Sequence, residues 1–306
     1  HKGWRLINYL PKLLANTLRA SKIIRTNKIT VVHVNDLYNM MGILLKLFHP
    51  RVRLVYHVRL LRNSYVKPVY GIWRFLVRRV ADRIICVSQC VLRDIGEGAN
   101  TKVIYDSLPE KWLLNGSYQS ENTPEIKALY IGNHIPGKGQ DFALDALSVA
   151  VKKVPGLRLK FLGDHSGSDD SKAFLHSLRT KTATYKLENY VTFAGYSDQV
   201  QLEILDSHFL INFSESESFS MTCLESLACR RPVIVTDCGG PTEVVRDGIN
   251  GLLVPNRSIP HMSRALIKMA SDKDLRLKFS DNAQTDFKDK FNIQQLSEQL
   301  YQVYTG

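Results

Sequence analysis

The sequence predicts an α/β protein that consists of two doubly wound, Rossmann-like domains. Short runs rich in β-branched and aromatic residues alternate with segments of helical period, which is typical of parallel sheets. The alternation stops once, in a stretch rich in Pro, Gly, Ser and Asn, and then restarts. A chain of 306 residues is also long enough to bury two cores.

The N-terminal half contains three predicted strands, 30–34 (TVVHV), 53–58 (RLVYHV) and 83–88 (RIICVS), with helical segments between them. We expect an N-terminal domain over residues 1–110 and a linker over 111–126. This domain is short for its class, so its first strand or two are expected to be missing.

The C-terminal half repeats the alternation over residues 127–306, and we expect a second domain there, with its last helix a candidate to pack back on the N-terminal domain. Its predicted strands are 127–132, 157–163, 190–195, 208–214, 231–237 and 250–255. Ligands of open α/β sheets bind outside the carboxyl ends of the strands, so the site is expected in the cleft between the domains.

Charge is divided unevenly along the chain. Residues 1–111 hold 20 Lys and Arg against 6 Asp and Glu, a net charge of +14, whereas residues 112–306 hold 21 against 23. A basic domain raises the local concentration of anionic ligands such as phospholipid, nucleic acid or a phosphorylated acceptor, although a solvated basic surface explains the same excess.

Residues 4–25 place leucines at helical spacing on one side and basic residues largely on the other. Such a helix can lie on anionic lipid, and it can equally be an ordinary crossover helix that covers a sheet. We therefore keep both interpretations, peripheral membrane contact and a structural helix.

The chain lacks the marks of several other protein classes. No apolar run reaches the roughly 18 residues of a membrane-spanning helix. The five cysteines form no Cys-x-x-Cys pair, which argues against a disulfide framework or structural zinc. There is no Asp-x-Asp metal motif, and SGSDD (166–170) is predicted to be a polar loop. We expect a cytoplasmic, metal-independent protein without a cofactor.

Two glutamates stand out at the end of the apolar run 208–214. Glu217 would lie in the loop after this strand, and Glu225 about a turn and a half inside the helix that follows. Carboxylates accept paired hydroxyl hydrogen bonds, and the amides at a helix start favour an anion. The pattern favours a nucleotide-sugar site, although an acid that stabilises the helix dipole and a surface glutamate would explain it too.

Most of residues 127–255 resembles the C-terminal domain of retaining glycosyltransferases of the GT-B fold, family 4, also called group 1. The segments that carry the resemblance are YIGNHIPGKGQDFALDAL (130–147) and the long stretch 191–255. In the N-terminal half, TVVHVNDLYNMMGILL (30–45), RLVYHVRLL (53–61) and ADRIICVSQCVLRDI (81–95) are similar to the family's acceptor side, and KVIYDSLPEKWL (102–113) to its interdomain linker. The family's glycine-rich first loop would precede residue 1.

The resemblance implies roles for single residues. Glu217 would contact the transferred sugar, Glu225 the ribose, and Lys138 the diphosphate leaving group, while His57 would lie near the reacting sugar. On the residues alone, Lys138 is also a plausible solvated turn residue and His57 a packed one. The other positions implied for the donor are Gly132, Asn133, Gly139, Ser218, Phe219 and Ser220.

One position departs from the family pattern. Asn133 stands where the family usually has an arginine, so the diphosphate would lose one of two cations. Arg59 and Arg62 are candidates to replace it or to contact the acceptor.

The implied activity is transfer of a hexose from a nucleotide-diphosphate sugar to a saccharide or lipid-linked acceptor, with retention of configuration. Cell-envelope or surface polysaccharide synthesis on the inner face of the membrane would suit the basic half. Two alternatives stay open, a basic nucleic-acid-binding protein and a nucleotide-sugar epimerase on the same fold. Against nucleic acid, the sequence shows no helix-turn-helix, zinc-finger or aromatic stacking motif.

Overall fold

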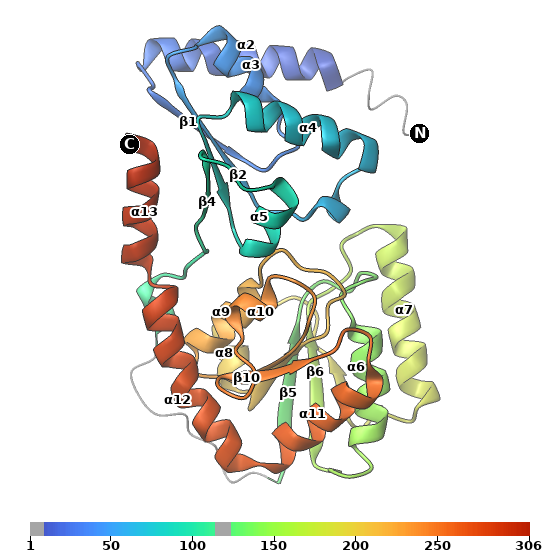
Figure 1. Cartoon of the computed structure of the whole chain (residues 1–306). Coiled ribbons are helices and arrows are strands. Elements are labelled where there is room, and N and C mark those ends of the chain that lie inside the picture. Colours follow the sequence, from blue (N-terminus) through green and yellow to red (C-terminus); the bar gives the residue numbers. More distant parts are fainter. Residues whose placement is uncertain (1–8, 114–123) are drawn as a thin grey trace. The chain divides into compact units, whose positions relative to one another are not determined.

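The computed structural model describes residues 9–113 and 124–306, and these divide into two compact units. Unit 1 is His1–Asp106 with Gln294–Gly306, and unit 2 is Ser107–Ile293. Each unit holds one sheet of parallel strands with helices against it (Figure 1). The α/β class and the two Rossmann-like sheets are thus confirmed.

Unit 1 has the strand order β1-β2-β3-β4. The strands are β1 (Val31–Asn35), β2 (Arg53–Val58), β3 (Arg83–Cys86) and β4 (Thr101–Val103). The helices are α2 (Tyr9–Thr26), α3 (Met41–Phe48), α4 (Lys67–Val80), α5 (Gln89–Ile95) and α13 (Ile293–Thr305), with single 3-10 turns at η1 (Arg62–Ser64) and, after unit 1, η2 (Glu110–Trp112).

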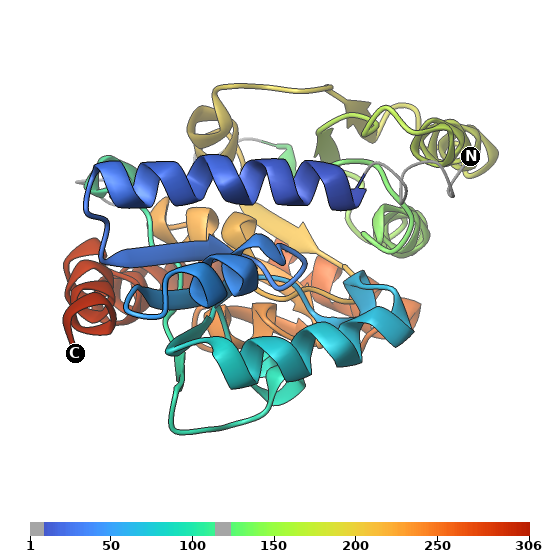
Figure 2. The same cartoon turned by 90° about the horizontal axis from the view of Figure 1, so that it is seen from above.

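The two faces of the unit 1 sheet are covered by different helices. Side chains alternate between the faces of a strand, so Val31 and Val32 point in opposite directions. Val31 lies with Val55, Ile85 and residues of α13 in one apolar cluster. Val32 lies with residues of α2 and α3 in another, and Figure 2 shows α2, in dark blue, beside β1. The last helix therefore belongs to unit 1.

Unit 2 has the strand order β10-β9-β8-β5-β6-β7. The strands are β5 (Ile126–Ile131), β6 (Leu157–Leu162), β7 (Val191–Phe193), β8 (Phe209–Asn212), β9 (Val233–Thr236) and β10 (Gly251–Val254). The helices are α6 (Gln140–Ala150), α7 (Asp169–Thr184), α8 (Val200–Leu205), α9 (Met221–Ala228), α10 (Pro241–Val244), α11 (Ile259–Ser271) and α12 (Lys273–Lys290).

The unit 2 core is largest on the sheet face covered by α6, α7 and α11. Ala128, Leu159, Phe161 and Ile211 point from successive strands into this layer and are almost fully buried. Both faces of the sheet are covered at β8, β9 and β10, which are nearly continuous apolar runs and were easy to locate in the sequence.

Two sequence interpretations differ from the structure. Residues 101–103 form β4, a strand that was not predicted and that overlaps the segment 102–113 likened to the family's linker, because a three-residue strand is too short to show alternation. Asp169 and Asp170 open α7 instead of lying in a loop, with the Ser168 hydroxyl accepting a hydrogen bond from the Ser171 amide as the cap. Residues 1–8 of the basic helix and 114–123 of the linker lie outside the described residues.

Candidate active site

The order of strands in the unit 2 sheet reverses between β5 and β8. From β5 the chain adds β6 and β7 on one side, and then returns to place β8 against the other side of β5. The loops that follow these two strands, residues 132–139 and 213–220, therefore leave the sheet in diverging directions. Ligands of doubly wound sheets bind at such a point. We call this place the switch-point crevice.

The loop after β8 is held by backbone hydrogen bonds on both sides. The Glu215 amide donates to the Gly137 carbonyl (2.9 Å), which ties the loop to the one after β5. The Glu217 amide donates to the Cys238 carbonyl (3.1 Å), and the Gly240 amide donates to the Glu217 carbonyl (2.8 Å). The backbone of Glu217 is thereby fixed beyond the ends of β8 and β9.

The two loops also meet at Gly139 and Tyr130. Gly139 has φ +77°, and a Cβ there would lie 1.9 Å from the Phe213 carbonyl oxygen, so only glycine fits. The Tyr130 hydroxyl donates to the Lys138 carbonyl and accepts from the Phe213 amide (2.9 Å). Tyr130 is fully buried, and this burial raises the pKa of its hydroxyl well above the usual value. The hydroxyl therefore stays neutral and links the two loops through these two hydrogen bonds.

These contacts bring Glu217 and Lys138 together, although 79 residues separate them. The Lys138 Nζ lies 3.2 Å from Glu217 Oε1, and the Asn212 amide donates to Glu217 Oε2 (2.8 Å). The side chain of Glu217 is 16% exposed and that of Lys138 34%. An acid that accepts one bond at each oxygen has a defined orientation, and the lysine keeps two further N–H donors for a ligand.

The start of α9 lies beside this pair. The Ser220 hydroxyl caps the helix by accepting from the Cys223 amide, and it is also bonded to the Asn212 amide (3.1 Å). Phe219 is 6% exposed, with its ring 6.1 Å from that of Phe291. The side chains of both residues are buried, and the expectation that their backbone amides bind an anion stays a prediction. Ser218 is half-buried between them and Glu217.

Glu225 lies inside α9 in a different environment from Glu217. Its carboxylate makes no hydrogen bond or ion pair with any residue in the described part of the chain. Burial raises the pKa of this carboxyl to about 7. A half-buried acid without a partner among the described residues is costly unless a ligand supplies donors, so Glu225 is a candidate binding group.

The loop after β5 holds the remaining positions in unit 2. Gly132 has φ +152°, and its carbonyl approaches Gly163, where a Cβ would lie 2.3 Å from it. Asn133 is exposed and its carbonyl accepts from the Gln140 side chain (3.1 Å). His134 is 1% exposed, neither ring nitrogen has a partner, and burial is the main cause of the lowered pKa of its imidazole.

The three positions predicted in the other half belong to unit 1. His57 lies near the end of β2, is 7% exposed, and has no hydrogen-bond partner at Nε2. Burial, and then the charges of Arg59 and His33, lower the pKa of its imidazole to about 3, so it is neutral. Arg59 is paired with Asp106, and the Arg62 amide donates to Asp94 (2.8 Å). Their predicted contacts with a ligand stay predictions.

Asn212 and Tyr130 were missed by sequence reasoning. Both lie in otherwise apolar strands next to the site, and a single polar side chain at the carboxyl end of a buried strand is a signal that could have found Asn212. Among residues 9–113 and 124–306, no three His, Cys, Asp and Glu side chains are placed to hold a metal ion. None of the described helices has the length and apolarity to cross a membrane.

Comparison with known protein families decides what kind of chain this is. Residues 118–286, more than half of the chain, match the family described as glycosyl transferases group 1. The chain belongs to the group 1 glycosyltransferases. Residues 2–106 match the description Glycosyltransferase Family 4, so each unit contains one of the matched ranges. Lys138, Glu217 and Glu225 all lie within the range 118–286 that matches the group 1 family.

Similar proteins of known and unknown function also carry glycosyltransferase names. An uncharacterized glycosyltransferase of Methanocaldococcus jannaschii is 28% identical over 227 residues, which cover 73% of this chain and 59% of the relative. The poly(glycerol-phosphate) alpha-glucosyltransferase of Bacillus subtilis is 30% identical over 160 residues, which cover 52% of this chain and 23% of the relative. The chain thus matches less than two thirds of the length of either relative.

A solved structure shows the same fold. The crystal structure of Anabaena HepE in complex with UDP and glucose superposes with a TM-score of 0.84 and 19% identity, covering 97% of this chain and 81% of HepE. The predicted GT-B fold is therefore confirmed.

Proposed function

We propose that this group 1 glycosyltransferase moves a hexose from a nucleotide-diphosphate sugar to a saccharide or lipid-linked acceptor, with retention at the anomeric carbon. The observation that carries the proposal is the switch-point crevice. It holds a lysine and an oriented glutamate 3.2 Å apart, and the helix that follows carries a second glutamate that has no partner among the described residues. The UDP and glucose bound in the HepE crystal structure are ligands of the proposed class.

Each group has a defined task in this proposal. Lys138 donates to the diphosphate as its charge develops, Glu217 accepts from sugar hydroxyls, and Glu225 accepts from the ribose diol. Groups that are fixed before the reaction stabilise charge without having to reorganise. The bonds from Asn212 and Lys138 supply that fixation for Glu217, and the Tyr130 hydroxyl supplies it for the lysine loop.

The proposed reaction needs no side chain as a nucleophile. The bond from the anomeric carbon to the diphosphate oxygen breaks, and the acceptor oxygen bonds to the same face of that carbon. The departing diphosphate oxygen takes the acceptor proton. The alpha-glucosyltransferase name of the Bacillus relative supports an alpha product. His57, neutral because its pKa is lowered, is proposed to face the sugar without carrying charge.

The acceptor is proposed to be reached at a membrane, on its inner face. Leu10, Leu14 and Leu18 recur at every fourth residue of α2 and are 51–62% exposed, and Lys22 and Arg25 border this row. Basic residues near an anionic surface add about 1 kcal/mol each to binding. A role in cell-envelope or surface polysaccharide synthesis follows as part of the proposal.

Transfer is tested with a panel of UDP-, GDP- and ADP-hexoses, and the first-formed product is examined by proton NMR. The anomeric coupling of the product is expected to match that of the donor. A product of inverted configuration would overturn retention, and free sugar or an epimerised nucleotide sugar as the only product would overturn transfer. Activity is expected to persist in EDTA, and a loss that Mg²⁺ restores would overturn metal independence.

A further inference from the structure

The side of α4 that faces solvent is apolar, although helices at the surface of a soluble protein usually turn polar residues outward. Pro68, Ile72, Phe75 and Arg79 follow one another at intervals of three or four residues, which places them in one row along the helix. All four are exposed, Ile72 by 61% and Phe75 by 65%. We call these four residues the α4 row.

The opposite side of α4 uses its cations inside the protein. The Arg74 Nε donates to the Ile95 carbonyl (2.7 Å), and the Arg78 guanidinium donates to the same carbonyl (2.9 Å) and to the two carbonyls that follow. These groups lie at the end of α5, where a helix carries partial negative charge and favours cations. The two arginines therefore fix the rotation of α4 about its own axis, and this rotation turns Ile72 and Phe75 outward.

The apolar surface has a neighbour on α3, which packs beside α4 (Figure 2). Leu47 is 65% exposed and Phe48 48%, both at the end of α3. Large apolar side chains gathered on neighbouring helices mark an interaction site more often than single ones do. Since α4 connects β2 to β3, the two inner strands of the unit 1 sheet, an unpaired sheet edge does not explain its exposed side.

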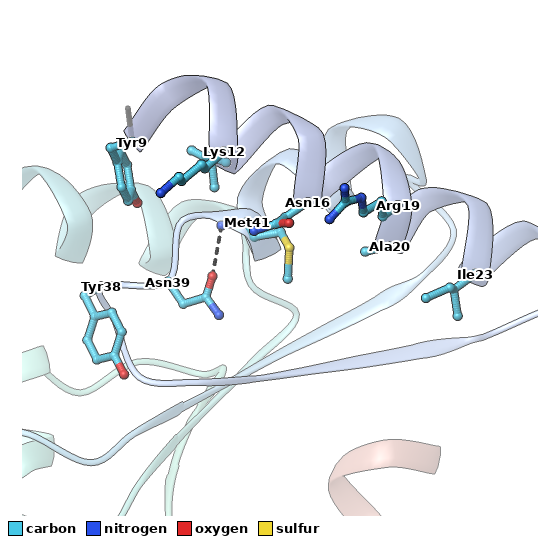
Figure 3. A pocket seen from close by; sticks show the side chains of 10 residues that line it. Tyr9, Lys12, Asn16, Arg19, Ala20, Ile23, Tyr38, Asn39 and Met41 are labelled. Atoms are coloured by element: carbon cyan, nitrogen blue, oxygen red, sulfur yellow. Dashed lines mark hydrogen bonds between the residues drawn. The ribbon is translucent and has the colours of Figure 1, made fainter. Parts of the chain in front are cut away.

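The charges on this helical layer have one sign. None of α2, α3 and α4 contains an acidic residue. Lys67 at the start of α4 and Arg79 at the end of the row are exposed, and neither makes an ion pair or hydrogen bond with any residue that the structure describes. On α2, by contrast, Lys12 and Arg19 line a hollow that Tyr38 also borders (Figure 3). The free cations of the outward surface are therefore those of α4.

An anionic bilayer matches these features. Side chains such as Ile72 and Phe75, which stand out from a convex helix, can enter the boundary between headgroups and acyl chains, where amphipathic helices sink by about 5–10 Å. Each exposed cation near anionic headgroups adds about fivefold to the affinity. A second copy of the chain fits less well, because it would bring the same cations together.

We infer that unit 1 docks on an anionic lipid bilayer through the α4 row and the adjoining end of α3, with Ile72 and Phe75 below the headgroups and Lys67 and Arg79 on lipid phosphates. This rests on the proposed function, in which the acceptor is reached at a membrane, and it names the surface that makes the contact. Loss of the α4 row then releases the protein more than loss of the leucine row of α2.

Cosedimentation of the full chain with vesicles of phosphatidylglycerol and phosphatidylcholine in equal parts measures the contact. Ile72→Gln with Phe75→Gln should weaken binding at least about tenfold, because two apolar side chains leave the lipid. The matched pair Val149→Gln with Leu202→Gln removes two exposed apolar side chains from α6 and α8 of unit 2, and should change the affinity less than about twofold. All four positions are exposed, so thermal unfolding should show both variants folded.

The charge is tested with a second pair. Lys67→Gln with Arg79→Gln should weaken binding to these vesicles at least about tenfold and leave any binding to pure phosphatidylcholine unchanged. Lys153→Gln with Lys268→Gln removes the same charge from exposed positions of unit 2, and should weaken binding less than about twofold.

Several results would overturn the inference. Equal effects of the α4 pairs and the unit 2 pairs would show that the row makes no special contact. Binding to pure phosphatidylcholine as tight as to the mixture would remove the anionic lipid. Self-association that Ile72→Gln with Phe75→Gln abolishes would show that a second copy covers the row. No vesicle binding by the wild type at low salt would leave an acidic protein as the occupant.

The leucine row of α2 separates this inference from the proposed function. If Leu14→Gln with Leu18→Gln releases the protein from vesicles and the Ile72 and Phe75 pair does not, the inference fails and the proposed membrane location survives. Transfer to a soluble saccharide acceptor needs no bilayer, so every variant should retain it. Vesicle binding without transfer to any acceptor defeats the proposed transfer alone.

Discussion

In unit 2 the charged groups of the switch-point crevice are bonded to one another, whereas in unit 1 the cations Lys12 and Arg19 of α2 have no partner in the described chain. Lys138 and Glu217 meet at 3.2 Å and are supported by Asn212. Lys12 and Arg19 stand on one helix side among exposed apolar side chains.

The difference teaches how the two sets of charges would work. Groups that must stabilise developing charge benefit from being fixed in advance, because no energy is spent on reorientation during the reaction. Groups that only bind a ligand need no hydrogen bonds within the protein, because the ligand supplies their partners. Glu225 lies in unit 2 but belongs to the second kind, because its carboxylate has no partner in the described chain and burial raises its pKa.

Lys138→Ala should have the largest effect. Removing a donor that stabilises developing charge costs about 100–1,000-fold in turnover. The side chain is a third exposed, so the fold should survive. Lys127, at the start of the same strand β5, is paired with Asp206 and is the matched control. Initial rates of transfer compare the two variants. Similar rates for both would show that the crevice does not carry out the reaction.

Glu225→Gln should change stability in a pH-dependent manner. The carboxyl has a pKa of about 7 in the folded chain against about 4.3 when unfolded, so between these values the folded state holds the extra proton. Stability of the wild type therefore falls as pH rises through this window, by up to about 3 kcal/mol. Urea unfolding at pH 4.5 and pH 8 should show the variant more stable only at pH 8.

Glu188→Gln is the control for this measurement, because Glu188 is exposed. A pH-independent difference between the wild type and Glu225→Gln would refute the buried state of Glu225.

Tyr130→Phe should have the smallest effect of the three. The loss of its hydroxyl leaves the Phe213 amide and the Lys138 carbonyl without that partner, at a cost of about 1–3 kcal/mol. Tyr185→Phe, which removes an exposed bond to Asp145, should cost less than about 0.5 kcal/mol. If Tyr130→Phe and Tyr185→Phe lower the stability in thermal unfolding equally, the two hydrogen bonds of Tyr130 are unimportant for the fold.

The strands of both units except β4 could be predicted because their apolar runs are short, buried and bounded by turn residues. The family resemblance also drew attention to Glu217, Glu225 and Lys138. Local pattern could not reveal that β8 lies against β5, which is what brings two loops 79 residues apart into contact. Strand order depends on packing between distant segments, and no window of the sequence contains it.

Supporting residues were the hardest to predict. Asn212 and Tyr130 act through pairs of side-chain hydrogen bonds whose partners are outside their own strands. The hollow that α2 borders with Tyr38 and Met41 was also not foreseen, because residues 4–25 have the same period whether the helix lies on lipid, covers the sheet or borders a cavity. Burial and contact between elements, which composition does not encode, separate these cases.

Thermal unfolding with UDP, GDP and ADP tests the central claim most directly, that unit 2 holds a nucleotide at the switch-point crevice. One nucleoside diphosphate at about 100 times its dissociation constant should stabilise the wild type by roughly 2.7 kcal/mol. Glu225→Ala should abolish that shift and Glu188→Ala should preserve it. Absence of a shift with all three nucleotides, or a full shift in Glu225→Ala, would contradict the account.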